Sequence, residues 1–68
     1  MGDVKTVVVM RDVVNLRQGP TLQQSVLNKT TRGMIYKVLR SSSGWFQLGF
    51  YDNNEAAGWV RNDLVWGQ

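Results

Sequence analysis

The sequence contains no cysteine and no histidine, and these two absences exclude much chemistry. Without cysteine, neither a disulfide nor a thiolate metal site is possible. Without histidine, the chain lacks the commonest general base, the commonest metal ligand and every Ser-His or Cys-His nucleophile pair. Five carboxylates remain, at Asp3, Asp12, Asp52, Glu55 and Asp63. Because catalysis needs tuned titratable groups gathered in a concave site, we expect no catalytic residue, no metal, no cofactor and no enzymatic activity.

Acidic residues are missing from the middle of the chain. Between Asp12 and Asp52 the sequence carries five basic residues and no acidic one: Arg17, Lys29, Arg32, Lys37 and Arg40. The formal net charge of the whole chain is +3. Such an excess suits an anionic partner, which could be a nucleic acid, a wall polymer or free carboxylates. A solvated basic face that only keeps the protein soluble is the alternative.

Long apolar runs are also missing. No segment approaches the roughly 20 apolar residues of a transmembrane helix. The first ten residues, MGDVKTVVVM, lack the basic region and apolar stretch of a signal peptide. A chain of 68 residues is at most one small domain with a thin core. We therefore expect residues 1–68 to form a single domain, either excised from or appended to a larger protein.

The chain is rich in valine and in turn-forming residues. Its ten valines favour strands, because β-branched side chains lose rotamer freedom in helices and pack well on a pleated surface. Turn signals recur about every ten residues, the spacing of a small all-β barrel or sandwich. The strands are predicted at about 4–10, 13–17, 26–30, 34–40, 45–51 and 57–61, with a short pairing near 64–66. The segment TLQQSVLN is predicted to be a structured loop whose Leu22, Val26 and Leu27 fold down onto the barrel.

Alternation along each predicted strand assigns side chains to one face or the other. The resulting core consists of apolar residues from several strands: Val14, Leu16, Val26, Tyr36, Val38, Phe46, Leu48, Val60 and Leu64. Trp45 and Trp59 fall on the opposite parity, beside polar neighbours. There a large aromatic side chain serves either as half-buried cover or as a binding surface. Trp66, near the end of the chain, is expected to seal the open end of the barrel.

Four motifs follow one another in the chain: VNLRQGPT (14–21), VLNKTTRGMIYKVL (26–39), GWFQL (44–48) and AGWVRNDLV (57–65). As an ordered set they resemble the bacterial SH3-like domain, often called SH3b, over residues 7–65. The resemblance implies an all-β fold, a small SH3-like barrel of five to seven short, mostly antiparallel strands. Such domains are usually attached to cell-wall hydrolases and other envelope proteins. The resemblance therefore also implies an extracellular, cell-wall or periplasmic location.

The function implied by the resemblance is that of a non-catalytic binding module that targets peptidoglycan or its stem peptides. Two alternatives remain open. The barrel could dock a neighbouring catalytic domain or another protein, or it could bind nucleic acid through its surface aromatics and basic residues. The candidate ligand-binding residues are Arg17, Trp45, Tyr51 and Trp59. The aromatic side chains offer apolar platforms, and the arginine offers a fork of donors suited to a carboxylate.

Overall fold

The computed structural model describes residues 5–53 and 55–67 of the protein. These residues form seven strands and one short 3-10 helix, and none of their helices has the length and apolarity needed to cross a bilayer. In chain order the elements are β1 (Thr6–Val9), β2 (Val14–Arg17), β3 (Val26–Thr30), β4 (Ile35–Ser42), β5 (Trp45–Phe50), β6 (Ala56–Arg61), η1 (Asn62–Leu64) and β7 (Val65–Gly67). Val4, where the first predicted strand begins, lies outside the described residues. The predicted all-β class is confirmed.

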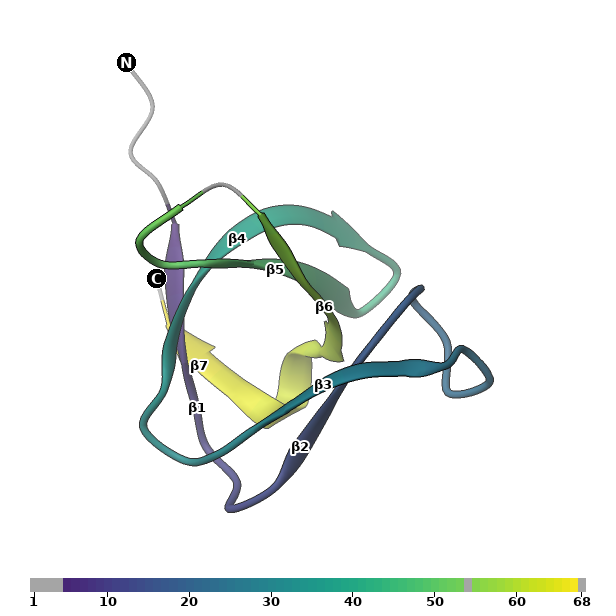
Figure 1. Ribbon diagram of the computed structural model, residues 1–68, viewed down its shortest axis with the longest axis horizontal. Helices are drawn as coiled ribbons and strands as arrows, with labels where there is room; N and C mark the ends of the chain where they lie inside the picture. The colour runs from purple at the N-terminus through teal and green to yellow at the C-terminus, as the bar shows by residue number, and fades with distance from the viewer. Residues whose placement is uncertain (1–4, 54, 68) are drawn as a thin grey trace.

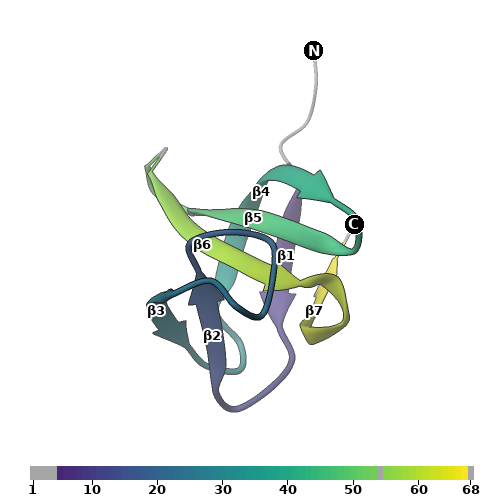
Figure 2. The ribbon, with the colours of Figure 1, turned by 90° about the vertical axis from the view of Figure 1, so that its right-hand side faces the viewer.

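The strands form one antiparallel sheet in the order β3-β2-β6-β5-β4-β1-β7. Strands β4, β5 and β6 make a meander, while β1 and β7 pair with each other on one flank and β2 and β3 on the other. The sheet curls around a central core, so that β1, β2 and β6 lie on different sides of it (Figure 1; Figure 2). A small barrel of short antiparallel strands is therefore confirmed.

A tight turn places Trp45 at the start of β5. Ser43 and Gly44 connect β4 to β5 and both have positive φ, 48° and 88°. Two successive residues with positive φ give a hairpin loop whose twist matches that of the flanking strands. Glycine adopts this conformation without strain, which explains why the turn ends in Gly44. The turn brings Ser42 opposite Trp45 in the ladder.

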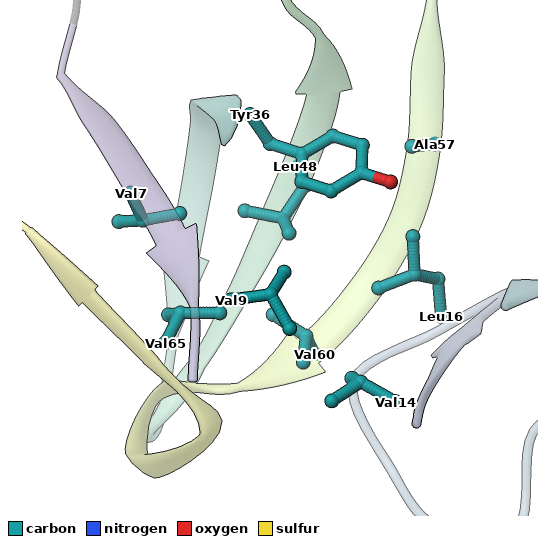
Figure 3. Packing of buried hydrophobic residues seen from close by; sticks show 9 residues of the cluster. All are labelled: Val7, Val9, Val14, Leu16, Tyr36, Leu48, Ala57, Val60 and Val65. Carbon is teal, nitrogen blue, oxygen red and sulfur yellow. The ribbon is translucent and has the colours of Figure 1, made fainter. Parts of the chain in front are cut away.

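Nine buried apolar side chains form the core (Figure 3). The predicted members Val14, Leu16, Tyr36, Leu48 and Val60 are all among them, and Val38, Phe46 and Leu64 are partly buried against them. The remaining core residues were not predicted from alternation: Val7, Val9, Ala57 and Val65. The strand β1 therefore contributes two core side chains, Val7 and Val9, although its uninterrupted run of valines shows no alternation.

Two of the expectations about burial are wrong. Val26 and Leu27 are 42% and 51% exposed, because they lie on β3, an edge strand that pairs only with β2, and no further strand covers that flank. Leu22, in the loop before β3, is 61% exposed and does not join the core. Trp66 is 65% exposed and does not seal the barrel end. In the β1–β7 ladder it is Val65 that points inward, opposite Val9.

A close approach between β2 and β6 brings the two halves of the sheet together. Arg17 and Trp59 are opposite each other at this crossing. Gly58, next to Trp59, has a φ of +140°, and a Cβ at this position would lie 2.8 Å from Cβ of Leu16. Only glycine adopts this φ without strain and also leaves room for the side chain of Leu16. The glycine of the GWV motif thus allows β2 to dock on β6 and fixes Arg17 beside Trp59.

Candidate functional site

Trp45 and Trp59 lie on the outer face of the sheet, as the alternation predicts. Trp45 is opposite Arg61 in the β5–β6 ladder, and Trp59 is opposite Gln47. Directly opposed residues of an antiparallel pair project to the same face. The intervening pair, Phe46 and Val60, therefore projects to the other face and joins the core. Both tryptophans are half-buried, so each still offers part of its ring to a ligand.

An open groove runs over Trp45. One hollow of about 430 Å³ is lined by Pro20, Thr21, Leu22, Gln23, Trp45 and Arg61. A second hollow, of about 190 Å³, shares Leu22, Trp45 and Arg61 with the first and continues along β2. The second hollow adds Val13, Val14, Asn15, Arg17 and Leu64. We call these two neighbouring hollows together the Trp45 groove.

The loop between β2 and β3 forms one wall of the groove, and it is held in place by its own backbone. The amide of Gln18 donates to the carbonyl of Ser25 at 2.8 Å, which closes the base of the loop. Gly19 is buried within it, and a Cβ there would lie 2.9 Å from the side chain of Gln24. In Figure 2 this loop crosses in front of β6. The Gly-Pro sequence therefore shapes a loop that holds Leu22 over the groove.

Two guanidinium groups line the groove. Nη1 of Arg17 donates to the carbonyl of Gln24 at 3.0 Å, which ties the side chain to the loop. Nη2 of Arg61 donates to Oδ2 of Asp63 at 2.8 Å. Each guanidinium has five N–H donors, so donors remain on both. Among the described side chains that line the groove there is no carboxylate. The groove combines an indole with positive charge.

The structure brings three of the four candidate residues together. Arg17 and Trp45 line the groove. Trp59 lines neither hollow, but it is the cross-strand partner of Arg17 and is diagonal to Trp45, about 7–8 Å away across the ladder. Tyr51 is 64% exposed in the turn after β5, six residues from Trp45 and hence about 20 Å along an extended strand. It lines neither hollow, and its part in ligand binding stays a prediction.

Of the eleven described residues that line the groove, only Arg17 and Trp45 were candidates, and the residues that were missed include Arg61 and Leu22. The sequence held a signal for Arg61, since it is two positions after Trp59 and must share its face. For Leu22 it held none, because the position of this side chain depends on how the β2–β3 loop lies against β5 and β6.

A larger hollow lies elsewhere, between the β1–β2 loop and the β3–β4 turn. It measures about 480 Å³ and is lined by Asp12, Val13, Lys29, Thr30, Thr31, Met34 and Tyr36. The hydroxyl of Tyr36 donates to Oγ1 of Thr30 at 2.7 Å in the interior. The carboxylate of Asp12 accepts from Nε of Arg32 at 2.9 Å. This hollow has no indole and no paired guanidiniums, so the Trp45 groove is the better candidate for recognition. Nowhere in residues 5–53 and 55–67 do three potential metal ligands gather.

Comparison with models of known families gives a match to the bacterial SH3 domain over residues 12–65. The chain belongs to the bacterial SH3 domain family. This confirms the resemblance carried by the four motifs and the SH3-like nature of the barrel. A search of curated proteins gave no match. Bacterial SH3 domains are generally non-catalytic binding modules, and they often occur in extracellular or cell-wall proteins.

Proposed function

We propose that this bacterial SH3 domain binds the peptide stems of peptidoglycan in the Trp45 groove and thereby holds an envelope protein on the cell wall. The observation that carries the proposal is the groove itself, in which the partly exposed indole of Trp45 is flanked by Leu22 and by two arginines. Peptide sites combine apolar platforms with a few well-placed polar groups in this way.

The candidate residues have distinct parts in this proposal. Trp45 is the apolar platform, because a large rigid ring gives contact area at a small entropy cost. Trp59 extends the platform on the same face toward β2. Arg17 supplies hydrogen-bond donors at one wall, where its bond to Gln24 already restricts the side chain. Residues 1–68 act as a module of a larger protein, and the role of the module is to place its host at the wall.

Co-sedimentation of the domain with purified sacculi tests this function. We expect the wild-type domain to pellet, and Trp45→Ala or Trp59→Ala to leave most of the protein in the supernatant. Trp66→Ala is the matched control, since it removes an exposed tryptophan that lies outside the groove. Circular dichroism establishes that each variant is folded. A folded wild-type domain that stays in the supernatant would refute the proposal, as would an equal loss of binding in the Trp66→Ala control.

A docking function is the second candidate, because the structure has a separate exposed apolar row. Val8 is opposite Ile35 in β4 and opposite Trp66 in β7, so the three side chains share one outer face. Ile35 is 51% exposed and Trp66 is 65% exposed. A neighbouring domain that covers this row would shield Trp66 from a water-soluble quencher in the full-length host. In that case Trp66 is quenched freely in the isolated domain, while quenching of Trp45 is the same in both.

A further inference from the structure

We infer that the ligand of the Trp45 groove carries a free carboxylate, which Arg17 and Arg61 hold from two sides above the indole of Trp45. The inference rests on the proposed function and makes it more specific, since it names the chemical group that the site recognises. The ligand is a peptide with a free C-terminal or side-chain carboxylate, rather than an uncharged glycan.

Arg61 already binds one carboxylate within the domain, that of Asp63. Its Nη2 donates to the Asp63 carboxylate at 2.8 Å, the distance of a charge-assisted hydrogen bond. Its side chain is 49% exposed, and it lines both hollows of the groove. Since Asp63 engages one nitrogen, the other N–H donors of the planar fork remain for a second acceptor.

Arg17 faces the same space from β2. Its bond to the Gln24 carbonyl fixes the guanidinium against the loop wall, so less side-chain freedom is lost when a ligand binds. Arg17 and Arg61 both line the smaller hollow, which Trp45 also lines. An anion placed there therefore meets two fixed or partly fixed cations.

The remaining lining of the groove favours a peptide over other anions. No described lining side chain bears a negative charge, and the nearby carboxylate of Asp63, which lines neither hollow, engages Arg61 through one nitrogen only. Leu22, Pro20 and Leu64 provide apolar surface against which the methyl groups of a peptide can pack. A nucleic acid, by contrast, would call for several stacking platforms in series, and a single indole lines the groove.

The experiment compares two soluble peptides that differ only in the group at issue, N-acetyl-D-Ala-D-Ala and its C-terminal amide. Each is titrated into the domain while NMR follows the indole N–H of Trp45, and a thymidine octanucleotide is titrated in parallel. We expect the acid to bind at least about tenfold more tightly than the amide, because charge-assisted hydrogen bonds are lost in the amide.

Variants of the two arginines test which side chains hold the carboxylate. Arg17→Lys and Arg61→Lys keep the positive charge but lose the planar set of guanidinium donors, so both should bind the acid more weakly. Lys5→Gln, a charge-removing control outside the groove, should bind it like the wild type.

Failure of the inference and failure of the proposed function give different results. If the amide binds as well as the acid with the same shifts at Trp45, or if sacculi bind while neither peptide does, the carboxylate inference is wrong and wall binding stands. If neither sacculi nor peptides bind, the proposed function fails and the inference with it. Tighter binding of the octanucleotide than of the acid would overturn both. A loss of binding in Lys5→Gln as large as that in Arg61→Gln, which removes the same charge within the groove, would show a general charge effect and overturn the two-arginine arrangement.

Discussion

Trp45 and Arg61 lie directly opposite each other on β5 and β6, with both side chains on the outer face of the barrel. The same register directs Phe46 and Val60 into the core. A single strand pairing therefore places core residues on one face and the residues of the proposed binding site on the other. A movement that separated Trp45 from Arg61 would also separate Phe46 from Val60 in the adjacent pair of the ladder.

Asp63→Asn is expected to strengthen binding of an anionic ligand. The asparagine can still accept the hydrogen bond from Arg61, but the negative charge that competes with the ligand is gone. Exposed ion pairs are worth up to about 1 kcal/mol, so we expect affinity for the carboxylate peptide to rise by up to about fivefold and stability to change little. Calorimetric titration measures the first quantity and urea unfolding the second. Weaker binding would mean that Asp63 acts mainly by orienting Arg61.

Leu22→Ala is expected to weaken binding without destabilising the domain. The side chain is 61% exposed, so its truncation removes little buried area, yet it lines both hollows of the groove. Loss of its ligand contact should cost about 1 kcal/mol of binding free energy. Leu27→Ala is the matched control, because Leu27 is 51% exposed on β3 and lines neither hollow. Equal affinities of the two variants for sacculi would place the ligand outside the groove.

Gly58→Ala is expected to destabilise the domain more than Gly33→Ala. Both glycines have positive φ, so alanine is strained at either position at a cost of about 1–2 kcal/mol. At Gly58 the new Cβ would also lie 2.8 Å from Cβ of Leu16, whereas at Gly33 it would meet nothing within 4 Å. The total for Gly58→Ala should reach about 3 kcal/mol or more. Urea midpoints compare the two, and similar midpoints would argue against the close approach of β2 and β6.

Tyr36 and Thr30 should behave as a coupled pair. Their side chains are nearly buried and joined by a hydrogen bond of 2.7 Å, so Tyr36→Phe leaves the Thr30 hydroxyl unsatisfied. Each of Tyr36→Phe and Thr30→Val should cost about 1–3 kcal/mol of unfolding free energy. The double variant should cost less than the sum by about 1 kcal/mol, because it removes both partners together. Strictly additive losses in a double-mutant cycle would rule out the bond.

Alternation predicted the faces of β2, β5 and β6 because each of these strands has one side in the core and one side in solvent. It predicted the outward position of Trp45 and Trp59 for the same reason. It failed for Val26, since a residue pattern does not tell an edge strand from a covered one. It also missed Val7 and Val9, because a continuous valine run has no alternation and only the pairing with β4 and β7 selects the buried face.

The groove was only half predictable. Its residues on β2, β5 and β6 follow from strand parity, so Arg17 and Trp45 could be named from the sequence, and Arg61 shares the same parity. The wall formed by the β2–β3 loop depends on contacts between segments more than twenty residues apart, such as Leu22 and Trp45. Such contacts leave no local signal. The separation of Tyr51 from Trp45 likewise follows from the length of β5, which begins at Trp45 and ends one residue before Tyr51.

The most direct test of the account is a two-dimensional NMR titration of the labelled domain with soluble muropeptides. The account predicts saturable shift changes that cluster at Leu22, Trp45 and Arg61, with the resonances of Tyr51 and Trp66 unchanged. Changes that cluster instead around Trp66 and Ile35, or around Lys29 and Met34 in the larger hollow, would contradict it, as would spectra that do not change at all.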